Sequence, residues 1–120
     1  MRKQCISSTL NRLINYKMKV IYNNILPIGK NKVAMTLYPF IFVKRKHAAL
    51  FTPKVLNHEL IHEAQIKELG LIRFYIMYLW FFVKGGYKRA NPFELEAYAH
   101  DDDLDYLKHR EKYAWKSYVI

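Results

Sequence analysis

The chain has almost no cysteine: Cys5 is the only one among its 120 residues. One thiol cannot close an internal disulfide, and no Cys-x-x-Cys pair is present, so a disulfide scaffold and a zinc ribbon or finger are excluded. We interpret Cys5 as a structural or free thiol near a frayed terminus. Residues 1–5 also lack the apolar stretch of a secretory signal. We therefore expect a cytoplasmic location, with the inner membrane surface as an alternative.

A hydrophobic run long enough to cross a membrane is also missing. The most apolar segment, 71–83, has thirteen residues and contains Arg73, whereas a spanning helix needs about 20. We interpret the segment as a buried helix, but a domain this small can hardly surround a helix completely. Contact with a membrane surface, or a homodimer through residues 71–83, is therefore an open alternative. The side chains expected on such a surface are Tyr75, Tyr78, Leu79 and Phe82.

Acidic residues are few: 10 stand against 20 basic ones, which gives a net charge of +10. The densest basic cluster is 44–47. No helix-turn-helix or other nucleic-acid motif accompanies it, so we expect no nucleic-acid partner. We interpret the charge mainly as keeping a very aromatic domain in solution, while an anionic membrane surface stays open as a partner. The chain length and hydrophobic content predict a single domain over 1–120.

The residue patterns predict an α+β fold, mostly helical, with a small N-terminal sheet beside one central helix. Strand-like runs occupy 19–22, 32–38 and 40–44, and Pro39 suggests that the third run is an edge strand. Residues 1–17 are expected to form a short helix or arm. The expected helices are roughly 53–69, 71–83, 92–100 and 102–114.

The chemistry of the chain is concentrated in an H-E-x-x-H motif at 58–62. Residues four apart lie on one face of a helix, so His58 and His62 can direct their imidazoles at one metal ion. Glu59 is placed to reach a metal-bound water as general base, which is how zinc metallopeptidases use this motif. The alternative is a solvated helix face that carries two histidines.

The surroundings of the motif favour a helix. Thr52 can cap its first N–H groups, Pro53 suits the first helical position, and Gly70 is a natural stop. These signals place both histidines in the middle of the helix, where a metal site requires them.

A catalytic zinc usually has three protein ligands and one open position. No third histidine follows at the expected spacing, and two acidic side chains, Glu94 and Glu96, lie at the start of a later helix. The small side chain of Ala97 would let that helix approach the metal helix closely. Glu96 is the alternative ligand, but it points about 200° away from Glu94, so both cannot bind one metal. Glu94 could also serve only the dipole of its own helix.

The H-E-x-x-H motif followed by E-x-x-A-Y at 94–98 resembles the gluzincin branch of the zinc peptidases, which includes the prenyl-protein endopeptidase-like membrane peptidases. The chain is also similar to small bacterial zincin-like proteins in which an Asn-Pro-Phe-Glu-x-Glu-Ala-Tyr segment follows the zinc helix. The resemblance implies that His58, His62 and Glu94 bind Zn²⁺ and that Glu59 is the catalytic base. It departs at Tyr98, where these peptidases often have an aspartate that supports a ligand histidine.

The first hypothesis is therefore a zinc-dependent metallopeptidase that acts on a peptide or protein substrate, with Glu59 as general base. By analogy with zincin folds, residues 40–44 would pair with an extended substrate. Candidate oxyanion donors are Tyr98, Tyr106, His109 and Arg110, and the histidines expected at the surface are His47, His100 and His109.

Two other hypotheses remain. A non-enzymatic, zinc-stabilised interaction module would keep the metal but close the fourth position; the intact Glu59 argues against it. A metal-free basic domain that docks on membranes or nucleic acid would make the whole motif accidental.

Overall fold

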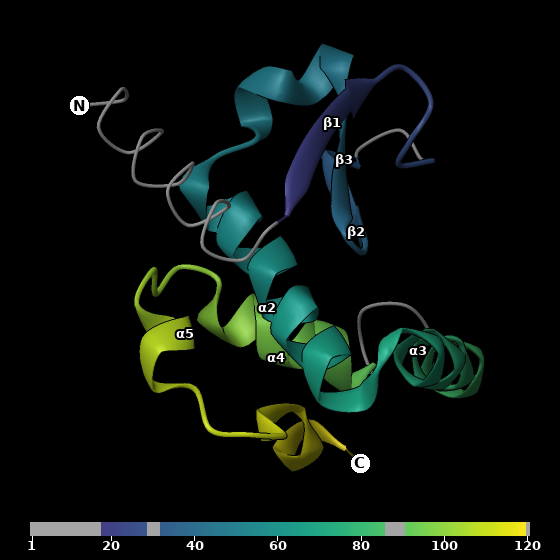
Figure 1. Cartoon of the computed structure of the whole chain (residues 1–120), viewed down its shortest axis with the longest axis vertical. Coiled ribbons are helices and arrows are strands. Elements are labelled where there is room, and N and C mark those ends of the chain that lie inside the picture. Colours follow the sequence, from purple (N-terminus) through teal and green to yellow (C-terminus); the bar gives the residue numbers. More distant parts are fainter. Residues whose placement is uncertain (1–17, 29–31, 86–90, 120) are drawn as a thin grey trace. The chain divides into compact units, whose positions relative to one another are not determined.

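The computed structural model describes residues 18–28, 32–85 and 91–119. The predicted arm at 1–17, with Cys5, lies outside the described residues. The fold is α+β, as predicted, with a small sheet followed by helices (Figure 1). The chain divides into two compact units, up to Leu60 and from Ile61 onward, and the boundary falls inside helix α2 (Pro53–Leu69).

The sheet of the first unit has three strands: β1 (Lys19–Asn23), β2 (Ala34–Leu37) and β3 (Phe40–Lys44). Their order is β1-β3-β2, with β3 parallel to β1 and antiparallel to β2. The prediction of an edge strand at 40–44 is therefore wrong, because β3 is central. Pro39 lies in the turn before β3, so its missing N–H does not interrupt the pairing of that strand.

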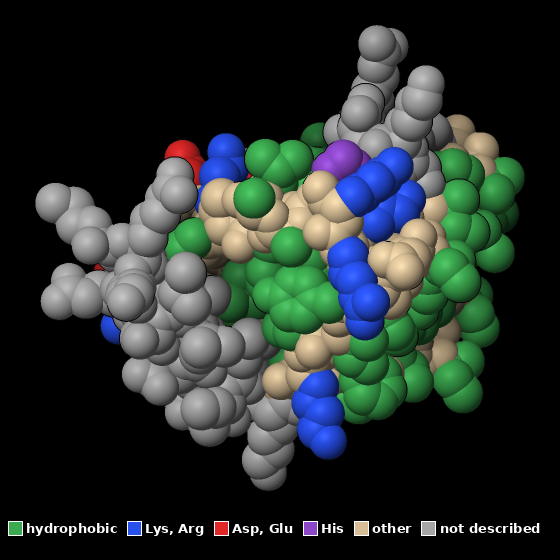
Figure 2. All heavy atoms as spheres, turned by 90° about the horizontal axis from the view of Figure 1, so that it is seen from above, with side chains coloured by type: hydrophobic (Ala, Val, Ile, Leu, Met, Phe, Trp, Pro, Cys, Tyr) green, Lys and Arg blue, Asp and Glu red, His purple; other side chains and the backbone are tan. Residues whose placement is uncertain are grey.

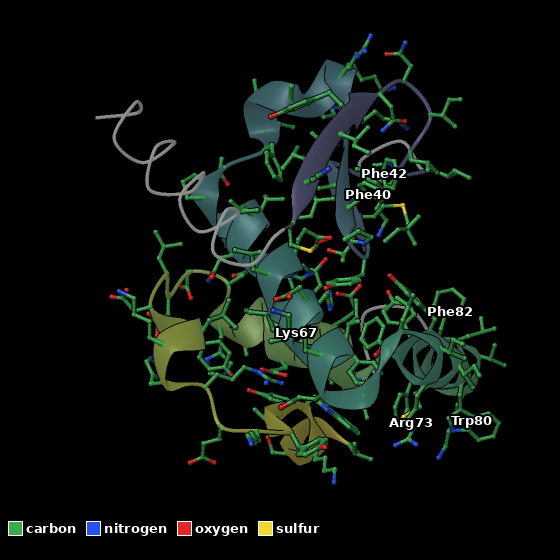
Figure 3. The ribbon with its side chains drawn as sticks, in the orientation of Figure 1. Phe40, Phe42, Lys67, Arg73, Trp80 and Phe82 are labelled. Atoms are coloured by element: carbon green, nitrogen blue, oxygen red, sulfur yellow. The ribbon has the colours of Figure 1, made fainter. Side chains whose placement is uncertain are left out.

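The core of the first unit joins β3 to the start of α2. Ile41 and Val43 alternate along the strand and are fully buried, as is Leu60, while Leu56 is 1% exposed. Burial at every second residue is the pattern of a strand with one covered face. On the other face, the rings of Phe40 and Phe42 lie 6.0 Å apart (Figure 3).

Helix α2 begins and ends where the sequence predicted. The Thr52 hydroxyl accepts a hydrogen bond from the Val55 N–H at 3.4 Å, which caps the first turn. At the other end Gly70 has a φ of 84°, a left-handed conformation that favours glycine and stops the helix. Helix α3 (Leu71–Gly85) starts directly after this residue.

The second unit also contains helix α4 (Pro92–His100), whose start is likewise as predicted. The Asn91 side chain accepts a hydrogen bond from the Phe93 N–H at 3.0 Å, and Pro92 occupies the first helical position. Phe93 is fully buried and is the centre of an aromatic core. Its ring lies 4.8 Å from that of Phe74 and 4.9 Å from that of Trp115.

The predicted helix over 102–114 is wrong. The structure has a four-residue helix α5 (Tyr106–His109) and a 3₁₀ helix η2 (Ala114–Tyr118) instead. The Asp103 carboxylate accepts the Asp105 N–H at 3.0 Å, so a local turn competes with a longer helix. Tyr113 has a φ of 59°, which an α-helix cannot include.

Candidate metal centre

Two histidines and a glutamate form a buried group. His58 and His62 lie one turn apart on α2, and Glu94 lies in the first turn of α4. Each offers one ligand atom, and these atoms all lie within 4.8 Å of one another. A group of this kind could hold a metal ion.

Helix α4 reaches this position because of a small residue, as predicted. Ala97, one turn after Glu94, is fully buried in a cluster with Ile61 of α2 and Tyr106 of α5. A larger side chain at 97 would hold α4 away from Ile61, the residue next to His62.

Glu94 is held by a partner on each carboxylate oxygen. Its Oε1 lies 2.8 Å from Nε2 of His62, and its Oε2 accepts a hydrogen bond from the Tyr78 hydroxyl at 2.8 Å. The Tyr78 ring also lies parallel to the ring of Phe93, with centroids 6.4 Å apart. Tyr78 of α3 therefore belongs to this group, which corrects the prediction that it lies on an outer surface.

The other ring nitrogen of His62 is oriented by Gln65. Nδ1 of His62 lies 2.9 Å from Oε1 of Gln65. The Gln65 amide nitrogen donates to the Phe93 carbonyl and to Glu96, both at 3.0 Å. With both donors used on acceptors, the oxygen of Gln65 must face the imidazole, so His62 carries a proton on Nδ1.

This tautomer limits what can lie between His62 and Glu94. In that tautomer, Nε2 of a neutral His62 is an acceptor, and it lies 2.8 Å from another acceptor, Oε1 of Glu94. Two acceptors can face each other at that distance only when a proton or a metal cation lies between them. The alternatives are an imidazolium–carboxylate ion pair and a metal bound by both atoms, and His58 supplies the further ligand that the second alternative needs.

Glu96, the alternative ligand, is turned away into a separate buried network. It accepts hydrogen bonds from Tyr106 at 2.7 Å and from both Nε and Nη2 of Arg110. Arg110 also makes a two-pronged contact with Glu68, at 2.9 and 3.0 Å. The network joins the C-terminal segment to α2 and α4, and Gln65 connects it to His62.

The charges of this network shift the ionisation of its members. Burial by itself would raise the pKa of Glu96, but hydrogen bonds from Arg110, Gln65 and Tyr106 outweigh it and hold the pKa below the ordinary value of 4.5. Burial and the neighbouring Glu96 carboxylate raise the pKa of the Tyr106 hydroxyl. Glu96 is therefore an anion at neutral pH, paired with Arg110.

Glu63, beside the second histidine, is not a member of the group. Burial raises its pKa, and the ion pair with Lys67, at 2.7 Å, only partly offsets this. Its second oxygen has no hydrogen-bond partner among the described residues.

Glu59, the expected base, lies next to His58 but outside the group of three. Its side chain is buried, and its Oε1 accepts a hydrogen bond from the Thr36 hydroxyl at 3.2 Å. The same hydroxyl lies 3.3 Å from the Glu59 carbonyl oxygen. Strand β2 therefore orients the carboxylate that follows the first histidine.

The side chains predicted as oxyanion donors bind other residues or are exposed. Tyr106 and Arg110 are bound to Glu96, and His109 lies 3.2 Å from the exposed Asp103. Tyr98 is 46% exposed, and the side chain that contacts Nδ1 of His62 is Gln65.

Two of the three histidines expected at the surface are less exposed than predicted. His47 and His100 are half-buried, and the His100 ring stacks on that of Tyr106 at 3.9 Å. His109 is exposed, as expected.

Sequence analysis missed Gln65 and Tyr78. Gln65 had a readable signal, because it follows His62 by three residues and so lies on the same helix face. Tyr78 had no such signal in the sequence, because it is one hydroxyl-bearing residue within an apolar segment. Its contact with Glu94 depends on how α3 packs.

The donor atoms of the group suit a transition metal. Two imidazole nitrogens and one carboxylate oxygen match a catalytic zinc site that keeps its fourth position for water. Imidazole also suits copper, iron and nickel, so the donor atoms alone leave the metal open. A scan of protein-family models and searches of curated proteins and of solved structures found no match for the chain.

Proposed function

We propose that the chain is a zinc-dependent metallopeptidase in which His58, His62 and Glu94 bind the metal. The observation that carries this proposal is the approach of His62 Nε2 to Oε1 of Glu94 at 2.8 Å, while Gln65 engages Nδ1 of the same ring. A metal cation would take the place of a proton between these atoms, and His58 has its ligand atom within 4.8 Å of both. A bound zinc ion would supply Lewis acidity, lowering the pKa of a water molecule and polarising the scissile carbonyl.

Glu59 is the general base in this proposal. It takes a proton from the attacking water and passes it to the leaving amine. Its carboxylate is about 100° around the helix from His58, so it lies beside the ligands and leaves their face free for the metal. The Thr36 hydroxyl holds Oε1 of this carboxylate, which fixes its direction before substrate arrives.

Two further residues position the ligands. Gln65 fixes the tautomer of His62, and Tyr78 fixes the second oxygen of Glu94. Partners of this kind orient metal ligands and raise their affinity for the metal.

The strand that would bind substrate has to be reassigned. Residues 40–44 were expected to pair with an extended peptide, but β3 already has a strand on each side. Strand β2 lies at an edge of the sheet and carries Thr36, which contacts Glu59. A peptide added along β2 would run close to the general base.

A closed zinc site is the second candidate function. His58, the most exposed of the three ligand side chains, is only 9% exposed, and structural zinc sites are closed to solvent. In that case the chain would be a zinc-stabilised interaction module.

The Glu59→Gln variant separates the two candidates. Zinc-loaded wild type and variant would be assayed against a broad peptide library, with zinc content measured in the same samples. A peptidase loses cleavage by at least about a hundredfold in the variant and keeps its zinc. The exposed Glu111→Gln is the matched control and should cleave like wild type. Full zinc binding without cleavage by the wild type would favour the module.

A further inference from the structure

Helix α3 has an exposed stripe of aliphatic side chains. Its members are Ile72, Ile76, Leu79 and Val83, which are 75%, 65%, 61% and 73% exposed. Their spacing of four, three and four residues places them in one line along the helix. Figure 2 views the molecule from above Figure 1 and shows hydrophobic side chains with lysine and arginine side chains among them; it does not single out α3. We call these four residues the α3 stripe.

The opposite side of α3 fixes this orientation. Phe74 is 3% exposed and packs on Phe93, with ring centroids 4.8 Å apart. Tyr78 donates its hydrogen bond to Glu94. The helix cannot rotate to bury the α3 stripe without breaking both contacts.

The apolar surface continues past the start of the helix. An open hollow lies at the corner between α2 and α3, and none of its residues belongs to the His-His-Glu group. It is lined by Leu69, Gly70, Leu71, Ile72, Arg73 and Ile76. An aliphatic surface of this extent marks a place where something binds. Among the described helices, none has the length and apolar character needed to cross a membrane.

Positive charge and an indole border the stripe on one side. Arg73, Trp80 and Lys84 fall within about 40° of one another around the helix. Figure 3 shows Arg73 and Trp80 extending from the same side of α3 and Phe82 from the other. The whole helix contains no aspartate or glutamate.

These charges argue against a second copy of the chain as the partner. In a parallel two-fold pair of α3 helices, the Arg73 side of one helix would lie opposite the Phe82 side of the other, which has no acidic residue. In an antiparallel pair centred on the helix, Arg73 would face Lys84. The antiparallel arrangement places like charges opposite one another, and the parallel one offers these charges no acidic partner on α3, so neither arrangement compensates them.

We propose that the α3 stripe docks on the surface of an anionic phospholipid membrane. The aliphatic side chains would enter the boundary between headgroups and acyl chains, as those of interfacial helices do. Arg73 and Lys84 would contact lipid phosphates, and Trp80 would lie at the headgroup level, where indole rings are favoured. The net charge of +10 would attract the whole chain to such a surface. This docking does not depend on a bound metal or on peptidase activity.

The test is co-sedimentation of the whole chain with vesicles of phosphatidylcholine alone or with about one-third phosphatidylglycerol. Binding should require the anionic lipid and should weaken as salt is raised. Ile76→Ser/Leu79→Ser should lower the partition coefficient at least about tenfold, because two exposed aliphatic side chains no longer enter the lipid. Arg73→Gln and Lys84→Gln should each lower it about fivefold.

Matched substitutions distinguish the stripe from general hydrophobicity and charge. Ile25→Ser/Leu104→Ser also removes two exposed aliphatic side chains, and Lys108→Gln removes an exposed charge outside α3. These controls should bind like wild type. Because every substituted side chain is at the surface, circular dichroism should show an unchanged fold.

Three results would overturn the proposal. The folded wild type could fail to bind anionic vesicles, or the α3 variants could bind them as well as wild type does. It could also form a dimer in analytical ultracentrifugation that Ile76→Ser/Leu79→Ser dissociates, which would assign the stripe to a second copy of the chain.

Discussion

His62 and Gln65, three residues apart on α2, are joined by a hydrogen bond of 2.9 Å between Nδ1 and Oε1. Because the Gln65 amide nitrogen is used by Phe93 and Glu96, this bond sets the tautomer of His62. It leaves Nε2 as the atom available to a metal.

Gln65→Leu should therefore weaken zinc binding by about tenfold to a hundredfold, the usual effect of losing a partner of a ligand histidine. The substitution keeps the size of the side chain but removes the acceptor that fixes Nδ1. Competition with a chromogenic chelator measures the affinity. The exposed Glu111→Leu is the control, and equal affinities for the two variants would rule out this role for Gln65.

Tyr78→Phe tests the other support. The variant keeps the ring that packs beside Phe93 but loses the hydroxyl that donates to Glu94 at 2.8 Å. We expect zinc affinity to fall about tenfold. Tyr113→Phe, at an exposed tyrosine outside the group, is the matched control and should keep wild-type affinity. A Tyr78→Phe variant that also binds normally would show that the hydroxyl only fills space.

The choice between the two glutamates of α4 makes a ranked prediction. Glu94→Ala should largely abolish zinc binding, because it removes a ligand. Glu96→Ala should retain most of it but should lower stability by on the order of 3 kcal/mol, since Arg110 loses a buried partner. Zinc content after gel filtration and urea unfolding check the two effects, and the reverse ranking for zinc would reassign the ligand.

Glu96 also predicts a pH dependence of stability. Its folded pKa lies below the ordinary value of 4.5, so between these two values the unfolded chain binds more protons. The contribution of Glu96 is complete above about pH 4.5 and is lost as the pH falls through the folded value. Urea unfolding of metal-free protein from pH 6 downward should show this loss, and Glu96→Gln should lack it. If the free energy of unfolding fell equally with pH in wild type and Glu96→Gln, the lowered pKa of Glu96 would be contradicted.

Much of this arrangement could be predicted because its signals are local. Thr52 and Asn91 mark helix starts by capping, and Gly70 marks a helix end by its left-handed conformation. The histidine pair follows from the helical repeat alone. The angle of about 200° between Glu94 and Glu96 indicates only that both cannot bind one metal. Glu94 is favoured because it shares a helix face with the small Ala97.

The errors came where distant segments decide the outcome. The central position of β3 depends on its pairing with β1, which no local pattern at 40–44 contains. The helix expected at 102–114 is interrupted by the Asp103 turn and by Tyr113. The role of Tyr78 depends on which side of α3 is buried. An all-round apolar helix does not reveal that side in its sequence.

The most direct test of the account is the zinc content of purified protein, measured by elemental analysis in wild type, His62→Ala and His109→Ala. His109 is an exposed histidine outside the group, so its variant controls for adventitious binding. We predict about one zinc per chain in wild type and His109→Ala and a sharp loss in His62→Ala. Equal zinc content in all three proteins, or none in wild type after purification with zinc, would contradict the proposed metal centre.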